Sequence, residues 1–242
     1  MKPYYFLLFL LIATCRQDPP VKIPDIDSDI VFYATFDGHS LDHISGQYGT
    51  IHKCTYGRDR NGQNLKALYL SARDSAFVDF GDLARASFPE NKFTIAVSYM
   101  LYDSSLPSAL LSKRGVQGPW EYSIDNHFSL TKYTLDNWVE NGAGTVYGID
   151  PLKAAVPTNT WKWHHLAFVA DGQVLRVYYD GKIQLGIDSI NVGKEFANTG
   201  AHLVVGNGGN WGKIHYFSGA IDEVRMYKRA LPIDAIKRLA DM

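Results

Sequence analysis

Short apolar runs, each closed by turn-forming residues, dominate the chain from residue 30 onward. The clearest early runs are Ile30–Phe36, Ala67–Leu70, Phe77–Phe80 and Phe93–Leu101. These runs are rich in β-branched and aromatic residues, which favour strands. The pattern therefore predicts an all-β fold built from many short strands.

The segment His164–Leu185 carries the strongest hairpin signals. Two Asp-Gly pairs, at 171–172 and 180–181, separate three apolar runs. Asp-Gly suits a type I′ turn, which needs a positive φ at both central positions. We therefore predict a three-stranded antiparallel meander here, followed by strands over Ala201–Val205 and Ser218–Tyr227.

One helix is predicted, at the end of the chain. Pro232 stands where the first helical residue is expected, and Ile233, Ile236 and Leu239 recur at helical spacing. We expect this short helix to pack on one end of the β fold.

The N-terminal residues have the pattern of an export signal. Lys2 is followed by the apolar run Tyr5–Ala13, which is shorter than the roughly 20 residues that a membrane span needs. A buried N-terminal strand or helix is the alternative. The run ends in Ile-Ala-Thr-Cys, which resembles the lipobox of bacterial lipoproteins, with Thr14 where Gly, Ala or Ser is usual. The resemblance implies a lipidated Cys15 and attachment to a membrane, at the bacterial outer membrane or cell surface.

The domain division follows from this signal. We predict a signal peptide over residues 1–15, a proline-rich tether over 16–29 and one domain over 30–242. If Cys15 carries lipid, Cys54 has no cysteine partner, and a disulfide between the two is the alternative. A net charge of −1 gives no reason to expect nucleic acid or an anionic surface as partner, and a hydrophobic content of 46% supports a sizeable core.

The closing stretch Phe217–Leu231 (FSGAIDEVRMYKRAL) resembles the terminal motif of laminin-G-like, concanavalin A-like domains. The strand motif at Phe93–Ile95 and the Trp-His-His-Leu run at 163–166 also resemble motifs of that family, and they occur along the chain in the same order as in the family. The resemblance covers about residues 30 to 240. It implies a two-sheet antiparallel jelly-roll β-sandwich with adjacent first and last strands. This fold serves lectins, adhesion modules, glycan-binding appendages and glycosidases, so it does not fix the function.

The carboxylates give little support for a glycosidase. Such enzymes need two carboxyl groups about 5–10 Å apart, and the Glu-x-Asp-x-x-Glu strand motif of concanavalin-like glycosidases is absent. Glu121 and Asp125 could share a strand face, which keeps hydrolysis as an alternative. His164 and His165 point to opposite faces of a strand and cannot form one site. We predict no catalytic residue.

Loop tryptophans favour a binding function. Trp138 lies in a loop with Asp and Asn, and Trp211 follows Asn207 and Asn210 in a glycine-rich loop. Sugars stack their C–H faces on such rings and bond their hydroxyls to amides and carboxylates. A structural role, in which the rings fill the ends of the sandwich, is equally consistent with the sequence for both tryptophans. For Trp120 the structural role is favoured. We predict a non-catalytic carbohydrate-binding module that uses Trp138, Asn207, Asn210 and Trp211, with a protein-binding or adhesion module as the alternative.

A structural calcium ion is predicted at Asp37, Asp42 and Asp222. In a regular strand, Asp222 shares a face with Val224 and Met226 and points inward, where a carboxylate needs a partner. The first strand is expected beside the last, which brings Asp37 and Asp42 near Asp222. Ca²⁺ takes six to eight oxygen ligands, so these carboxylates and loop carbonyls could hold it. Pairing of Asp222 with an arginine such as Arg58 or Arg60 is the alternative.

Overall fold

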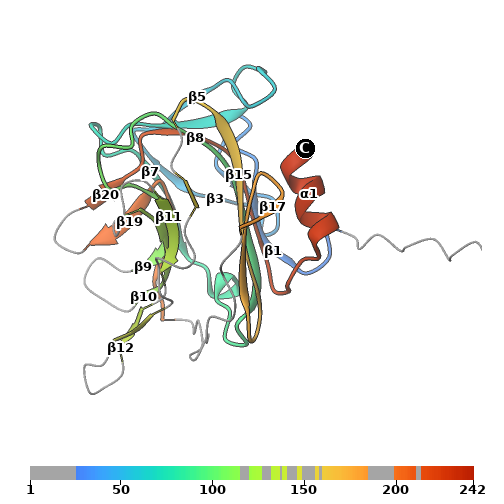
Figure 1. Cartoon of the computed structure of the whole chain (residues 1–242). Coiled ribbons are helices and arrows are strands. Elements are labelled where there is room, and N and C mark those ends of the chain that lie inside the picture. The colour runs from blue at the N-terminus through green and yellow to red at the C-terminus, as the bar shows by residue number, and fades with distance from the viewer. Residues whose placement is uncertain are drawn as a thin grey trace, which may run out of the picture.

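The computed structural model describes residues 26–114, 120–126, 132–136, 138–140, 146–148, 156–157, 160–184, 199–210 and 214–242. In these residues two large antiparallel sheets pack face to face, and one helix follows at the C-terminus (Figure 1). The predicted jelly-roll sandwich is confirmed. Cys15 and the predicted signal peptide lie outside the described residues. The described part contains no helix long and apolar enough to cross a membrane.

The first sheet has eight strands. Seven follow the order β17 (Lys182–Ile183), β16 (Leu175–Tyr179), β15 (Trp163–Asp171), β8 (Lys92–Leu101), β21 (Gly219–Tyr227), β6 (Ala67–Leu70) and β5 (Thr55–Gly57). The eighth, β1 (Ile30–Ala34), pairs with β21, with Ala34 opposite Val224. The first and last strands are therefore neighbours, as the sequence predicted.

The second sheet has seven strands, and three strand pairs lie outside both sheets. The order is β14 (Val156–Pro157), β11 (Lys132–Asp136), β10 (Trp120–Asp125), β9 (Ala109–Arg114), β18 (His202–Val205), β7 (Phe77–Asp82) and β4 (Thr50–His52). The pairs are β2 (Leu41–Asp42) with β3 (Gln47–Tyr48), β12 (Trp138–Glu140) with β13 (Val146–Gly148), and β19 (Asn207–Asn210) with β20 (Ile214–Tyr216). A short 3₁₀ helix spans Ala84–Ala86.

The predicted meander is present as β15, β16 and β17. Asp180 and Gly181 have φ values of 49° and 70°, which fits the type I′ turn expected for this pair. At the other Asp-Gly pair only Gly172 has a positive φ, and the Asp171 carboxylate accepts hydrogen bonds from the amides of Gln173 and Val174. The two turns therefore share a sequence but differ in geometry.

Alternate residues of the central strands build apolar surface on both faces of the first sheet. Ile95 and Phe168 belong to the core between the sheets, whereas Ala96 and Val169 lie on the outer face. Helix α1 (Ile233–Asp241) covers that outer face with apolar side chains that include Ile236 and Leu239. The expectation that the helix packs on an end of the sandwich was wrong, because the outer face offers it apolar area.

Candidate functional site

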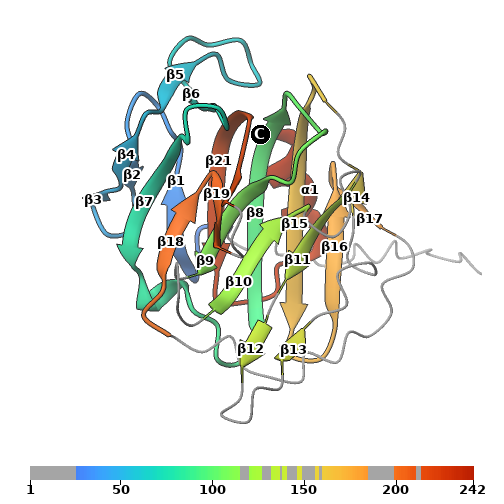
Figure 2. The same ribbon diagram turned by 90° about the vertical axis from the view of Figure 1, so that its left-hand side faces the viewer.

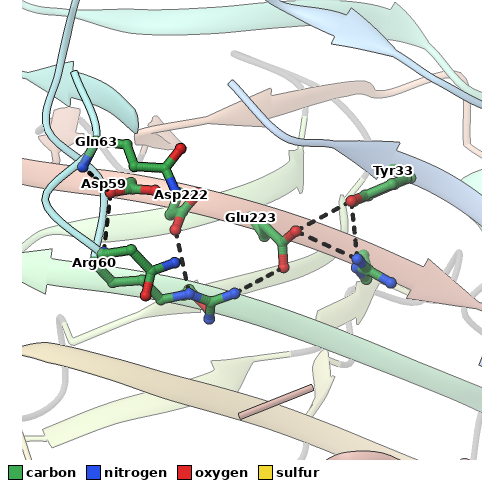
Figure 3. Close-up of polar contacts among 9 residues, drawn as sticks. Tyr33, Asp59, Arg60, Gln63, Asp222 and Glu223 are labelled. Atoms are coloured by element: carbon green, nitrogen blue, oxygen red, sulfur yellow. Dashed lines mark hydrogen bonds and ion pairs between the residues drawn. The ribbon is translucent and has the colours of Figure 1, made fainter. Parts of the chain in front are cut away.

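The loop between β5 and β6 carries Arg60 onto the outer face of the first sheet (Figure 3). The Asp59 carboxylate accepts hydrogen bonds from the amides of Asn61 at 2.9 Å and Gln63 at 2.7 Å, and Gly62 supplies a φ of 78°. Aspartate and glycine are the residues that stabilise such a turn. The turn holds the loop in the shape from which Arg60 reaches the sheet.

Arg60 joins three side chains of two central strands. Its Nη1 donates to Ser98 Oγ at 2.6 Å and its Nη2 to Glu223 Oε2 at 3.1 Å, while its Nε lies 3.4 Å from Asp222 Oδ2. We call the connected set the outer-face network. It comprises Tyr33, Arg60, Ser98, Asp222, Glu223 and Arg225.

A bulge in β21 explains why two successive acids both meet Arg60. Ile221 lies opposite Tyr99 and Val224 lies opposite Val97, so β21 has one residue more than β8 between these pairs. Ile221 and Val224 both belong to the core between the sheets. Asp222 therefore does not share the inward face of Val224, and the sequence-based expectation about its direction was wrong, because it assumed regular alternation.

Arg225 and Tyr33 close the network at its other end. Tyr33 Oη donates to Glu223 Oε1 at 3.1 Å, and Arg225 Nη2 donates to Tyr33 Oη at 2.9 Å. The Arg225 guanidinium also lies 4.1 Å from the centre of the Tyr33 ring. Each charged group of the network thus has a partner of opposite charge within it.

Burial controls the protonation of two groups in this region. Burial raises the pKa of Asp222 to about 7, although Arg60 opposes the shift. Burial, with Arg60 nearby, lowers the pKa of His165 to about 4, so this ring is neutral at pH 7. His164 lies on the opposite face of β15 and stacks on Tyr179 with the ring centres 4.8 Å apart. The two histidines therefore form no common site, as predicted.

The three carboxylates predicted to hold calcium each meet a cationic side chain. Asp37 Oδ2 lies 2.7 Å from Lys66 Nζ, Asp42 pairs with the Arg85 guanidinium, and Asp222 pairs with Arg60. Asp42 also accepts hydrogen bonds from the amides of Tyr33 and Ile44 and from the Ser45 hydroxyl. Within the described ranges, no three His, Cys, Asp or Glu side chains form a group that could hold a metal ion. The alternative of an Asp222–Arg60 pair is confirmed, and calcium binding itself stays a prediction.

Glu121 and Asp125 are the two carboxylates for which glycoside hydrolysis remained an alternative. Both are buried. Glu121 Oε1 lies 2.6 Å from Lys113 Nζ and accepts hydrogen bonds from the amide and hydroxyl of Thr199. Asp125 Oδ2 accepts a hydrogen bond from Ser123 Oγ at 2.7 Å. Both side chains are at most 1% exposed, so neither offers a carboxylate to solvent in this structure.

A cavity of about 440 Å³ opens at one rim of the sandwich, where strands of both sheets end. We call it the rim cavity. It is lined by Ala72 and Arg73 after β6, by Asp103, Leu106, Pro107 and Ser108 between β8 and β9, and by His215, Tyr216 and Ser218 before β21. The lining combines apolar side chains and an aromatic ring with a few polar groups, as small-molecule sites do.

The charged groups of the rim cavity are turned toward solvent. Arg73 and Asp103 are both exposed, and among the described residues neither forms an ion pair. Hydrogen bonds from Ser105 lower the pKa of Asp103, so its carboxylate is ionised at pH 7. The Tyr216 ring stacks on Phe77 with the ring centres 6.1 Å apart. A cation, an anion and an aromatic ring therefore all line the opening.

The residues predicted to bind a glycan lie partly near this cavity. Asn207 begins β19, whose partner strand β20 ends at Tyr216, and the Asn207 carbonyl accepts a hydrogen bond from Ser112 Oγ at 2.8 Å. Trp211 and the side chains of Trp138 and Asn210 lie outside the described residues. Figures 1 and 2 place the β12–β13 pair, which contains Trp138, well below β19. The predicted roles of these four residues stay predictions.

Sequence reasoning did not predict the residues that line the rim cavity. Asp103, Leu106 and Pro107 lie in a turn-rich segment between two apolar runs, and such loops often carry binding residues. The position of this segment between two predicted strands was the one sequence signal for a binding role. It gave no indication that Arg73 and Tyr216, far away in the chain, line the same cavity.

Comparison with known protein families identifies the superfamily of this chain. Residues 74–237 match the profile of the Concanavalin A-like lectin/glucanases superfamily, in its laminin-G form. The chain belongs to this superfamily. The match confirms the resemblance that the motif at residues 217–231 indicated.

Solved structures with the same fold include several binding domains. Domain 4 of the Geobacillus stearothermophilus arabinanase AbnA, in complex with arabinotriose, is 21% identical, with a TM-score of 0.67 over 88% of this chain and 98% of that one. The binding domain of Paraclostridial Mosquitocidal Protein 1 is 14% identical, with a TM-score of 0.64 over 89% of this chain and 52% of that one. Botulinum neurotoxin type C, whose cell entry depends on two ganglioside molecules, is 14% identical with a TM-score of 0.61, over 89% and 51%.

A curated mouse protein shows a more local likeness. The "Sushi, von Willebrand factor type A, EGF and pentraxin domain-containing protein 1" of Mus musculus is 30% identical over 123 residues. The matched region is 48% of this chain and 3% of the mouse protein. The chain thus corresponds to a small part of that protein.

Proposed function

We propose that the protein is a non-catalytic carbohydrate-binding module whose ligand enters the rim cavity. The observation that carries this proposal is the composition of the lining: the Tyr216 ring, the exposed charges of Arg73 and Asp103, and the apolar Leu106 and Pro107 lie around one opening. The Tyr216 ring offers a face for stacking against the C–H face of a sugar. The charged and hydroxyl groups offer partners for sugar hydroxyls, which lose hydrogen bonds to water on binding.

The solved structures with the same fold support a glycan as the ligand class. The arabinanase domain was solved with arabinotriose, and the neurotoxin depends on gangliosides for cell entry. The shared fold does not by itself imply glycan binding, because proteins of one fold can have many functions. It makes glycans the first compounds to test.

The arrangement of carboxylates supports a binding role over a hydrolytic one. Asp103 is the one carboxylate among the described residues that line the rim cavity. Glycoside hydrolysis needs a pair of carboxyl groups flanking the bond to be cleaved. Glu121 and Asp125 are buried, and Glu121 is held by Lys113. Glycan binding without turnover therefore fits the described groups better.

We also propose that the module is exported and held at a membrane surface through a lipidated Cys15, which would place the rim cavity where extracellular glycans are found. Expression of the full chain in a bacterium that processes lipoproteins, with radiolabelled palmitate, tests this step. The wild type should carry the label and Cys15→Ser should not. Equal labelling of the two, or no labelling of either, contradicts the proposal.

A glycan array with three proteins tests the binding function. The wild type should bind at least one glycan saturably, and Tyr216→Ala should lose about tenfold in affinity, in line with other ring-stacking losses. Tyr48→Ala is the matched control, because Tyr48 is 67% exposed on β3 and does not line the rim cavity. Absence of saturable binding by the wild type contradicts the proposal and favours the protein-binding alternative.

A further inference from the structure

A second aromatic surface lies beside the rim cavity. Tyr102 and Trp161 stack with their ring centres 4.5 Å apart and their planes 17° from parallel. The edge of Tyr69 meets Tyr102 with the ring centres 6.1 Å apart. We call these three residues the aromatic platform. Trp161 is 68% exposed, so its ring is not a plug that completes the core.

The backbone of Trp161 is held in an uncommon conformation. Its φ is 60°, a value that costs free energy for any residue except glycine and is rare for bulky ones. The amide of Trp161 donates a 2.7 Å hydrogen bond to the Leu101 carbonyl, which fixes the residue at the end of β8. An exposed indole on a strained, tightly anchored backbone contributes little to stability. Such strain gathers at functional positions.

The aromatic platform adjoins the rim cavity through the backbone of Tyr102. Tyr102 directly precedes Asp103, and the Tyr102 amide donates a 2.9 Å hydrogen bond to the carbonyl of Ser218. Asp103 and Ser218 both line the rim cavity. Past these two residues, the next side chain along the chain is that of Tyr102, which stacks on Trp161.

We propose that the Tyr102–Trp161 stack is a second sugar-binding subsite, and that the ligand is a glycan chain running from the rim cavity over Trp161. This inference rests on the proposed function and specifies its ligand. A glycan that is confined to the cavity leaves the indole in water, whereas a longer chain covers both aromatic surfaces. Affinity should therefore rise with chain length until the chain reaches Trp161.

Trp161→Gly is the variant that tests the second subsite. Glycine adopts a φ of 60° without cost, so this variant removes the ring and relieves the backbone at the same time. Its melting temperature should stay close to that of the wild type, so that a change in affinity reports the ring alone. Trp161→Tyr keeps an aromatic face and serves as the conservative control.

The experiment is calorimetric titration with graded oligosaccharides, from disaccharide to hexasaccharide, in the arabinan, xylan, mannan and sialylated series. For a series that binds, we expect Trp161→Gly to lose about tenfold in affinity for the longest members and nothing for the disaccharide. Trp161→Tyr should keep most of the affinity for the longest members.

Four outcomes contradict the inference. Unchanged affinity of Trp161→Gly for the longest members, or an equal loss at every length, overturns the second subsite and leaves the proposed function standing. A melting temperature of Trp161→Gly well below that of the wild type means that the ring stabilises the fold, which contradicts a role in binding alone. Failure of the wild type to bind any series contradicts the proposed function, and the inference falls with it.

Discussion

The outer-face network and the rim cavity use charged residues in opposite ways. In the network, Arg60 lies between Asp222 and Glu223, and Arg225 pairs with Glu223. At the rim, Arg73 and Asp103 are exposed and form no ion pair with another described residue. Charges that neutralise one another hold elements of the fold together, whereas unpaired charges at an opening stay available to a ligand. The comparison predicts that substitutions in the network change stability and that substitutions at the rim change binding.

The largest loss of stability is expected at another internally paired group, the fully buried Lys113–Glu121 pair. Lys113→Met leaves the Glu121 carboxylate buried without its cation, which should lower the free energy of unfolding by about 3–5 kcal/mol. Urea denaturation measures the loss. Adding Glu121→Leu should recover most of it, because an apolar pair of similar size removes the stranded charge. Lys92→Met, at an exposed lysine of β8, should have almost no effect.

Arg60→Met should cost about 2 kcal/mol, because Asp222 loses its cation and the Ser98 hydroxyl loses its donor, while Glu223 keeps only Tyr33 and Arg225. Urea denaturation is again the measurement. Arg58→Met is the matched control in the same loop, since the Arg58 side chain donates to Asn64 at the protein surface. Equal stability of the two variants would mean that the network does not hold the loop.

The raised pKa of Asp222 gives the network a pH dependence of smaller size. Because this pKa is about 7 in the folded state, well above the ordinary value near 3.8, the folded protein holds a proton that the unfolded chain releases between these values. The stability from this proton is present below about pH 4 and is lost as the pH rises through 7. Asp222→Asn keeps a neutral side chain at every pH. Its stability relative to the wild type should rise by about 1 kcal/mol between pH 5 and pH 6 in thermal unfolding, and a constant difference would contradict the shift.

Calcium should have the smallest effect. An ion shared by Asp37, Asp42 and Asp222 must displace Lys66, Arg85 and Arg60 from them. Because these three ion pairs would have to break, we expect the predicted ion to raise the melting temperature only slightly above its value in chelator, and equal values would contradict the prediction. A melting temperature that rises with calcium concentration would establish a calcium site, because a ligand that binds the folded form stabilises it.

Local sequence signals predicted most of the fold. The Asp180-Gly181 turn predicted the pairing of β16 with β17, and the family resemblance carried by the closing motif at 217–231 predicted the pairing of β1 with β21. The direction of Asp222 could not be predicted, because one extra residue in β21 reverses the alternation and leaves no local signature. The helix was placed wrongly because the face that it covers is formed by strands distant in the chain.

The residues that line the rim cavity were not predicted, for a related reason. Asn207 was chosen from its own loop, whereas the rim cavity assembles three segments that are far apart in sequence. Trp161 precedes the strand that begins at Trp163, and in the sequence an exposed ring there looks the same as a core ring. Only the three-dimensional structure reveals its exposure, its stacking on Tyr102 and its strained backbone.

The central claim is that the outer-face network stabilises the fold whereas the rim cavity binds the ligand. Its most direct test is the affinity of two variants for a glycan that the wild type binds. Calorimetric titration at one temperature, at which both variants are folded, gives the two values. We predict that Tyr216→Ala binds about tenfold more weakly than the wild type and that Arg60→Met, although less stable, binds with wild-type affinity. Wild-type affinity in Tyr216→Ala, or a tenfold loss in Arg60→Met, would contradict the account.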